Sequence, residues 1–240
     1  MTTKTKLKTY TEISETVDYE DIWLTLSSRL TCERKEKMTQ VSSQRTNHLC
    51  LIIQDVCNEH NISAVLRSAE AFGIQNIHVV SETHNYRPSS VAKGSASWLS
   101  VHRHESIASC AKAVHEEGYK ICAAVPRPEA KSYDTISVEE PLALLFGNEH
   151  AGVSSKWESY VDIYFTLPMV GFVESLNISV CAALLIHHFV LKSQAELEPS
   201  KYHLTQKEQN QLLGSWICRK IPTWKQEYAH HKKKFIAKAI

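Results

Sequence analysis

Between residues 49 and 194 the sequence alternates short apolar runs with segments of helical periodicity, and this alternation constrains the fold more than any other feature. Short continuous apolar runs predict buried strands, while apolar residues spaced three and four apart predict helices. Strands separated by helices imply a mostly parallel sheet covered on both faces, because parallel neighbours need a long crossover between them. We therefore predict one α/β domain over residues 49–194.

The order of the elements in this domain follows from the same pattern. Strands are predicted at 49–56, 77–80, 97–101, 120–125, 142–146 and 162–167. Helices are predicted at 62–72, 107–117, 155–160 and 175–194, and the first two stop at Gly73 and Gly118, which allow the left-handed backbone that ends many helices. The apolar stretch 176–191 contains Asn177, His187 and His188 and is too short and polar to span a bilayer, so no membrane partner is expected.

The two flanks of this domain are predicted to be helical extensions. Residues 1–48 form an accessory arm, in which the range 19–38 contains a helix with Ile22, Leu26 and Leu30 on one face. Residues 195–240 form a basic extension with helices at 204–220 and 224–239. The first of these two helices carries an apolar stripe made of Leu212, Leu213, Trp216 and Ile217.

Charge is distributed unevenly, although the whole chain has a formal net charge of only +1. Seven basic residues and one acidic residue lie between positions 219 and 240, which gives this tail a charge of +6 and leaves −5 for the rest. A basic segment with interleaved aromatics is typical of sequence-independent contact with RNA, and its other interpretation is a solvated helix end. The tail residues expected to contact RNA are Arg219, Lys220, Lys232, Lys233 and Lys234.

Cysteine and histidine usage predicts a cytoplasmic protein without a structural metal. The 7 cysteines are odd in number and include no Cys-x-x-Cys pair, which fits a reducing compartment. Cys57 and His60 form a Cys-x-x-His pair, and His102 and His104 form a His-x-His pair, but neither is matched by a second pair at zinc-finger spacing. The N-terminal segment is polar and contains no apolar signal core.

Three polar clusters follow predicted strands, at the position where open α/β sheets bind their ligands. They are Asn61-x5-Arg67, Gly147-x-Glu149-x-x-Gly152, and Leu167-Pro-Met169 with Ser175-Leu-Asn177. Taken singly, each has a structural interpretation: a helix cap at Asn61 beside a surface arginine, a strand-to-helix turn, and a helix start. The patterns GxGxxG, GxxxxGK[ST] and GxSxG are absent, so dinucleotide, P-loop and serine hydrolase sites are not predicted.

Together and in this order, the three clusters resemble the three motifs of the SpoU/TrmH family of RNA ribose 2′-O-methyltransferases, in the SPOUT superfamily. The resemblance extends to Gly94-Ser-Ala-Ser-Trp98 and covers about residues 45–195. Within the family, the short arm and the C-terminal extension are similar to members that methylate a tRNA guanosine. Three residues depart from the family pattern, namely Phe146, His150 and Glu174.

The resemblance implies a deep trefoil knot in the C-terminal part of the domain, a homodimer, and S-adenosylmethionine as methyl donor. The residues implied to bind this cofactor are Ala124, Gly147, Leu167, Met169 and Leu176. The residues implied to serve catalysis are Arg67, Asn61, Glu149, Ser175 and Asn177. Arg67 would be the catalytic residue, and Lys93 joins it among the residues expected to contact RNA.

The chemistry of such a reaction sets what the side chains have to do. A ribose 2′-hydroxyl attacks only when its proton is withdrawn, whereas the sulfonium methyl is already activated. Because arginine keeps its charge, Arg67 is expected to hold a substrate phosphate with its planar fork, and loss of the hydroxyl proton is assisted either by that phosphate or by a locally perturbed guanidinium. The layout of arm and tail favours guanosine 18 of the tRNA D-loop as target. Two alternatives stay open: a ribosomal RNA 2′-O-methyltransferase, and a dimeric RNA-binding protein that has lost turnover; no DNA partner is expected.

Overall fold

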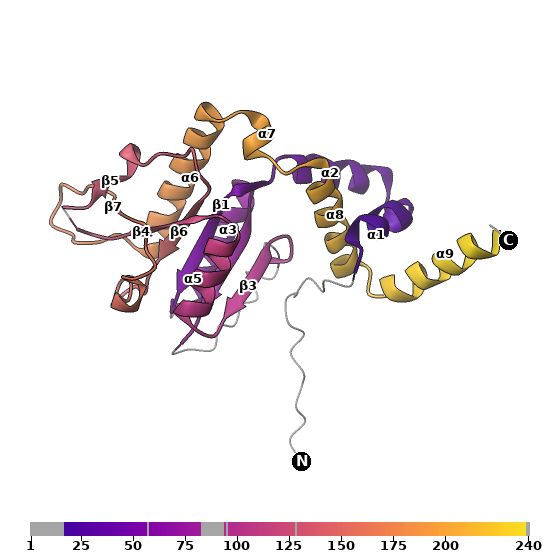
Figure 1. Ribbon diagram of the computed structural model, residues 1–240, viewed down its shortest axis with the longest axis horizontal. Helices are drawn as coiled ribbons and strands as arrows, with labels where there is room; N and C mark the ends of the chain where they lie inside the picture. Colours follow the sequence, from indigo (N-terminus) through magenta and orange to yellow (C-terminus); the bar gives the residue numbers. More distant parts are fainter. Residues whose placement is uncertain (1–16, 57, 83–93, 95, 128, 239–240) are drawn as a thin grey trace, which may run out of the picture.

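The computed structural model describes residues 17–56, 58–82, 94, 96–127 and 129–238. Figure 1 shows two parts side by side: an α/β body built around the sheet, and a smaller helical layer in which the N-terminal helices lie against a C-terminal helix. The last helix, α9 (Trp224–Lys238), extends away from the body at the far end of that layer.

The body contains a seven-stranded sheet in which every neighbouring pair is parallel. Its strands are β1 (Thr46–Gln54), β2 (Ile74–Val80), β3 (Ser100–His104), β4 (Lys120–Ala124), β5 (Lys131–Ser132), β6 (Leu142–Phe146) and β7 (Ile163–Thr166). The spatial order is β3-β2-β1-β6-β4-β7-β5, so β6 lies between two strands that precede it in the chain. The prediction of a mostly parallel α/β sheet is confirmed.

Both faces of the sheet are buried, as the continuous apolar strands predict. Leu51 and Ile53 of β1 pack under α3 (Glu59–Ala71) and α6 (Ile178–Glu196), whereas Cys50 and Ile52 point to the other face, which α5 (Ile107–Glu116) covers. Gly73 and Gly118 follow α3 and α5 with φ of 82° and 86°, the left-handed conformation expected there. This arrangement holds the carboxyl ends of the strands at one edge of the body.

Helix α6 is the one helix among the described residues that is long and apolar enough to cross a membrane, by length and composition alone. Its 19 residues exceed the apolar stretch 176–191 noted in the sequence, so length does not exclude a membrane span. Leu185, Ile186 and Phe189 of this helix are fully buried against the sheet and α3. A core helix with one buried side accounts for its composition.

The N-terminal arm differs in part from its prediction. Residues 19–38 do not form one helix: α1 (Tyr19–Leu26) ends in a 3₁₀ turn at Ser27–Arg29, and α2 (Cys32–Ser43) begins afresh. Leu30 is extended, with φ of −86° and ψ of 151°, and the Thr31 hydroxyl accepts a hydrogen bond from Arg34 N at 3.2 Å. The N-cap at Thr31 therefore restarts the helix in a new direction, a signal that the apolar spacing alone did not reveal.

The two flanks, predicted separately, share one hydrophobic core. The stripe on α8 (Gln206–Lys220) is buried as predicted and packs against Ile22, Trp23 and Leu26 of α1. A capping box between Thr205 and Glu208 starts α8. A short helix that the sequence pattern did not predict, α7 (Pro199–Tyr202), leads from the body into this layer.

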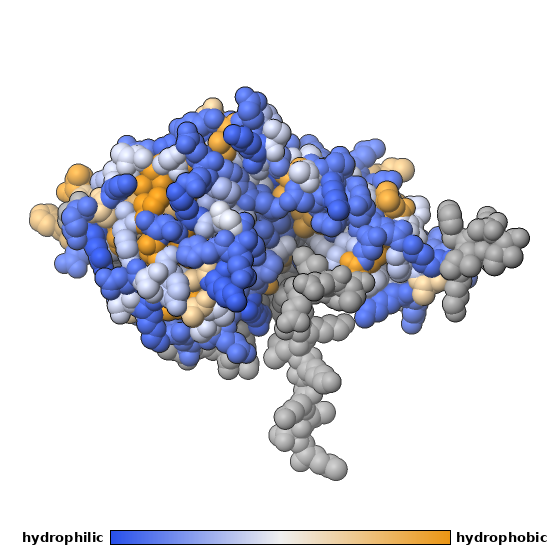
Figure 2. Space-filling view, in the orientation of Figure 1, coloured by the Kyte–Doolittle hydropathy of each residue, from blue (hydrophilic) through white to orange (hydrophobic). Residues whose placement is uncertain are grey.

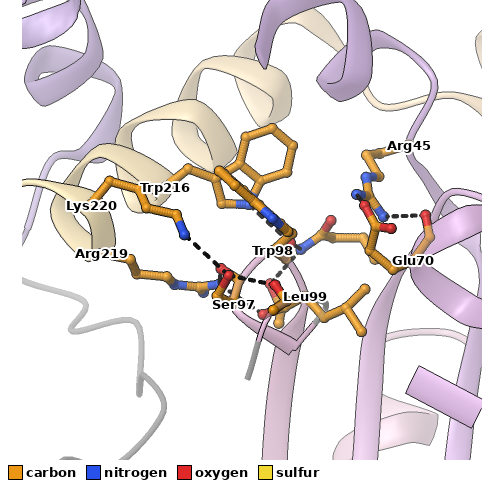
Figure 3. A network of polar contacts seen from close by, with 11 residues as sticks. Arg45, Glu70, Ser97, Trp98, Leu99, Trp216, Arg219 and Lys220 are labelled. Carbon is orange, nitrogen blue, oxygen red and sulfur yellow. Dashed lines mark hydrogen bonds and ion pairs between the residues drawn. The ribbon is translucent and has the colours of Figure 1, made fainter. Parts of the chain in front are cut away.

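A polar network joins the helical layer to the sheet edge, as Figure 3 shows. Trp216 Nε1 donates to Trp98 O at 2.9 Å, and Arg219 Nη1 donates to Ser97 O at 3.0 Å and Leu99 O at 2.8 Å. The guanidinium of Arg219 is mostly buried, which lowers its pKa. Arg219 was expected to contact RNA, but this geometry uses it inside the chain, because two carbonyl groups of the 97–99 segment engage it.

Replacement of Gly214 by alanine is expected to separate the two flanks. A Cβ on Gly214 would overlap the backbone carbonyl of Tyr19, where α8 crosses α1, and neither backbone can move without disturbing the shared core. Gly214→Ala should reduce the free energy of unfolding by about 3 kcal/mol, measured by urea denaturation. Gly94→Ala is the matched control, because its Cβ would meet nothing within 4 Å; equal stability of the two variants would contradict the packing described here.

Candidate functional site

The carboxyl ends of β4, β6 and β7 open into a cavity of about 430 Å³. This volume is within the range of small-molecule pockets, and parallel α/β sheets bind ligands at this edge. The structure brings together here all five residues expected to bind a cofactor, namely Ala124, Gly147, Leu167, Met169 and Leu176. Glu149, Ser175 and Asn177 of the expected catalytic set line the same cavity.

The turn after β6 forms one wall of the cavity. Asn148 and Gly152 exchange two backbone hydrogen bonds of 2.9 Å each, which closes the turn tightly. A Cβ on Gly147 would overlap the backbone of Gly152 and Val153, so only glycine fits at this position. The Asn148 side chain donates to Asp55 O at 2.7 Å, which ties the turn to the end of β1. Sequence reasoning identified Gly147 but missed Asn148.

Asp55, at the end of β1, was also not predicted as a site residue, although it contacts the turn after β6. Its φ of 45° is the one positive value among the described non-glycine residues. Its carboxylate accepts a hydrogen bond from Glu82 N at 2.9 Å, and its own N–H donates to Val80 O at 2.9 Å. Aspartate tolerates this left-handed backbone better than most residues, but a single aspartate after a strand carries no recognisable pattern.

A chain of side-chain hydrogen bonds links the three sequence clusters. Asn61 Nδ2 donates to Glu149 Oε1 at 3.0 Å, and Asn177 Nδ2 donates to Asn61 Oδ1 at 3.2 Å. In the sequence Asn61 is 88 positions from Glu149 and 116 positions from Asn177, yet the three side chains meet at one side of the cavity. Asn61 is the central member, because its amide can donate to a carboxylate and accept from a second amide at once.

Two helices, α3 and α6, begin beside this chain of hydrogen bonds, and the N-cap of α3 differs from the residue expected. The N-cap of α3 is Asn58, not Asn61, and Asn58 N donates to Glu149 Oε1 at 3.3 Å. Asn61 therefore lies in the first turn, where its side chain reaches Glu149. A carboxylate at a helix N-terminus is stabilised by the helix dipole. The cap of α6 is Asn177, whose Oδ1 accepts from Ser179 N at 2.9 Å, and the helix starts three residues after Ser175.

Arg67 lies elsewhere. It occupies the exposed side of α3 and is not among the residues that line the cavity. Asn61 and Arg67 are six positions apart, which places them on different sides of a helix with 3.6 residues per turn. The structure of one chain thus brings four of the five expected catalytic residues together and leaves the fifth outside.

One thiol lies among the side chains that line the cavity. Burial raises the pKa of the Cys181 thiol to about 11, so this lining side chain is neutral near pH 7. The three residues that depart from the family pattern all line the cavity as well: Phe146, His150 and Glu174. These three side chains are therefore expected to distinguish the pocket of this chain from those of its relatives.

The residues expected to contact RNA do not gather at one place as those around the cavity do. Lys93 lies outside the described residues, and the side chains of Lys233 and Lys234 are likewise beyond what the structure describes. Lys232 forms an ion pair with Asp21 at 2.5 Å. Lys220 Nζ lies 4.3 Å from the centre of the Trp98 ring and donates to Ser97 Oγ at 3.3 Å (Figure 3).

Comparison with known proteins agrees with this geometry. The sequence profile of the SpoU rRNA Methylase family matches residues 48–187, more than half of the chain and every element that forms the cavity. The chain belongs to this family. Over 192 residues it is 30% identical to the tRNA (guanosine(18)-2′-O)-methyltransferase of Thermus thermophilus, covering 77% of this chain and 95% of the relative.

Solved structures of SpoU proteins share the fold. The A. aeolicus TrmH/SpoU tRNA modifying enzyme superposes with a TM-score of 0.72 at 23% identity, covering 79% of this chain and 97% of that one. The SpoU methyltransferase AviRb from Streptomyces viridochromogenes, solved in complex with AdoMet, gives a TM-score of 0.58 at 22% identity and covers 63% of this chain and 62% of its own. The high coverage of the A. aeolicus enzyme shows that the likeness extends beyond the sheet into the flanking helices.

Proposed function

We propose that this SpoU methylase transfers the methyl group of S-adenosylmethionine to the ribose 2′-hydroxyl of guanosine 18 in the D-loop of tRNA. The observation that carries the proposal is the hydrogen-bond chain from Glu149 through Asn61 to Asn177, which joins three distant motifs beside one cavity. The T. thermophilus relative named for this activity is similar over 95% of its own length, which supports the choice of tRNA.

The cavity fits S-adenosylmethionine by its shape and by its donor set. Gly147 lets the turn after β6 fold tightly on itself, because a Cβ there would overlap the backbone of Gly152 and Val153, and this turn forms one wall of the cavity. Strand ends and loop backbone supply hydrogen-bond donors and acceptors for an adenosine, while Leu167, Met169 and Leu176 supply apolar contact. Bound there, the cofactor would supply an activated methyl group. We further propose that the loops after β6 and β7 form the trefoil knot of the SPOUT fold, since both line this pocket and β6 lies between earlier strands.

The residues around the cavity would have separate tasks. Glu149, Asn61 and Asn177 position one another, and with the N-termini of α3 and α6 they form a polar rim where a ribose can be oriented. Ser175, exposed at the same rim, would contact the substrate. Arg67 would hold a substrate phosphate beside the 2′-hydroxyl, and that phosphate would accept the hydroxyl proton as the methyl is transferred.

The protein would act as a homodimer, because an apolar surface lies open beside the site. Val180, Leu184 and Leu191 form a stripe along α6 and are each about half exposed, at 49%, 50% and 51%. Phe72, at the end of α3, contacts His187 of the same side of α6, with ring centres 5.4 Å apart. In Figure 2 hydrophobic residues gather where Figure 1 places α6, whereas the helical layer is mostly hydrophilic. A second copy covering this face would bury these side chains.

Leu184→Glu is expected to convert the dimer to a monomer. Burying two carboxylates without partners at a symmetric interface costs several kcal/mol, which opposes association of the two copies. Sedimentation velocity of the full chain measures the change. Leu24→Glu is the matched control, because Leu24 is also an exposed leucine, with 68% of its surface accessible, but lies on α1 away from α6. If the wild-type chain sediments as a monomer at micromolar concentration, the dimer proposal is wrong.

The substrate would be held mainly outside the cavity. We propose that the basic helix α9, with Lys220 beside Trp98, contacts the phosphate backbone and stacks on tRNA. Tyr228 and Lys232 of α9 bond to Asp21 of α1, so the helix has a defined direction from the body. We propose that the protein acts in the cytoplasm. The cysteines that the structure describes are all free, as is usual for proteins of a reducing compartment.

The target nucleotide can be tested directly. Incubation with S-adenosylmethionine carrying a radiolabelled methyl group is expected to label a tRNA transcript containing guanosine 18 and to leave a transcript with adenosine at that position unlabelled. Digestion of the labelled product to nucleosides should yield 2′-O-methylguanosine. Equal labelling of both transcripts would exclude guanosine 18. Labelling of ribosomal RNA but not of tRNA would favour the ribosomal alternative, and no labelling of either RNA with intact cofactor binding would favour a non-catalytic RNA-binding protein.

A further inference from the structure

A cluster of two histidines and a cysteine lies at the opposite edge of the sheet from the cavity. His78 comes from β2, His104 from the edge strand β3, and Cys110 from α5, which covers both strands. One ligand atom of each residue lies within 4.8 Å of those of the other two. Strand β1 stands between this cluster and the strands β6, β4 and β7 that end at the cavity, and no residue of the cluster lines that cavity, so the cluster is separate from the methyl-transfer site.

The side chains of this cluster are buried or half-buried rather than exposed on the surface. His78 is 1% exposed and Cys110 is fully buried, whereas His104 is half-buried and forms the open side. His78 Nδ1 and His104 Nε2 face each other at 3.0 Å.

The second ring nitrogen of His78 lies near a carboxylate. His78 Nε2 is buried and has no hydrogen bond among the described residues, and Glu117 Oε2 lies 4.0 Å away. If Nδ1 binds a cation, Nε2 must carry the proton, and a small movement lets it donate to the Glu117 carboxylate. Metal-bound histidines usually make this second contact, which fixes the ring and its tautomer.

We propose that His78 Nδ1, His104 Nε2 and Cys110 Sγ bind a zinc-type divalent cation, with Glu117 as a positioning residue and water in the fourth place. Binding replaces the thiol proton of Cys110, which leaves to solvent, by the metal–sulfur bond. Two imidazoles and one thiolate suit zinc and exclude magnesium and calcium, which prefer oxygen ligands. In a tetrahedral site the donor atoms lie roughly 3.3–3.8 Å apart, so the two imidazole nitrogens, 3.0 Å apart, need to open slightly, and any pair at the 4.8 Å limit needs to close by only ~1–1.5 Å.

Sequence spacing could not reveal this site, because its ligands come from three elements. Of the His102-x-His104 pair seen in the sequence, only His104 belongs to the cluster. His102 instead stacks on His78, with ring centres 4.9 Å apart. The register of β2 and β3 places His78 beside His102 and Val80 beside His104, so His78 and His104 are diagonal neighbours on the face under α5. A cation here would fasten the edge strand β3 to β2 and α5.

Cobalt binding tests the proposal. The full-length chain, first treated with a chelator and then titrated with Co²⁺ alone, is expected to show the near-ultraviolet thiolate-to-cobalt band and the visible bands of a tetrahedral site. Zn²⁺ should displace both sets of bands at one equivalent per chain. Thermal unfolding with added Zn²⁺ should shift to a higher temperature, because the cation binds only the folded chain.

Variants distinguish this cluster from other cysteines and histidines. Cys110→Ser should remove the thiolate band, His104→Gln should weaken Zn²⁺ binding at least tenfold, and Glu117→Gln should weaken it roughly tenfold. His104 is half-buried, so His104→Gln serves even if Cys110→Ser fails to fold. Cys218→Ser on α8 and His115→Gln on α5 are the matched controls and should bind Co²⁺ as the wild type does. Absence of the thiolate band in the wild type, or its persistence in Cys110→Ser, would overturn the proposal.

Discussion

Gly147→Ala is expected to abolish binding of S-adenosylmethionine while leaving the sheet folded. The added methyl would overlap the backbone of Gly152 and Val153, atoms that belong to the turn itself and cannot rotate away as a side chain can. The turn would have to open, which breaks the two backbone hydrogen bonds between Asn148 and Gly152. We expect the dissociation constant to rise at least about a hundredfold, a loss of about 2.7 kcal/mol, in isothermal titration calorimetry.

Gly171→Ala is the control for this prediction, because a Cβ there meets nothing within 4 Å. Gly171 belongs to the loop between β7 and α6, whose neighbouring residues line the cavity, so the control tests the same region without the clash. Cofactor affinity of Gly171→Ala should equal that of the wild type. If Gly147→Ala binds the cofactor as tightly as Gly171→Ala does, the turn does not form the cofactor wall. Circular dichroism of both variants separates local opening from general unfolding.

The sequence predicted the body of this protein well where local chemistry decided the structure. Strand β6 was predicted at its observed bounds, because Pro141 and Gly147 bracket an uninterrupted apolar run. The ends of α3 and α5 followed from Gly73 and Gly118, whose backbone conformation few other residues adopt. The two-residue strand β5 and the four-residue helix α7 were not predicted, because such short elements form through tertiary contacts and carry no periodicity.

Most of the predicted site residues gather at one cavity, but how they contact one another could not be predicted from the sequence. Asn61 was expected to cap a helix, whereas the cap is Asn58 and the Asn61 side chain bonds to Glu149 and Asn177. A helix cap and a polar contact to a distant loop use the same residue type, so one sequence cannot decide between them. The supporting contacts of Asp55 and Asn148 depend on how β1 and β6 lie side by side, which is a property of the sheet order.

Arg67→Ala is expected to reduce methyl transfer to tRNA by about a thousandfold and to leave cofactor affinity unchanged. Loss of one charged group that holds a transition-state or substrate phosphate costs on this order, and Arg67 does not line the cofactor cavity. Arg67→Lys keeps the charge but loses the planar fork, and should retain only a small part of the activity. Single-turnover labelling of tRNA measures the step. Full activity of Arg67→Lys would show that Arg67 does not act through a two-point phosphate contact.

The position of Arg67 outside its own cavity predicts that it serves the site of a second copy. Arg67 lies on the exposed side of α3, a helix that packs beside α6 and its apolar stripe, which would face a partner. In a mixed dimer of Arg67→Ala and Gly147→Ala chains, a site with the intact turn of one chain would then receive the intact arginine of the other. Co-expressed and purified as a heterodimer, two inactive variants should therefore regain about half of the wild-type activity per dimer, because one of the two sites is complete. If Arg67 acts within its own chain, every site in the mixed dimer lacks one component and activity stays at the level of the single variants.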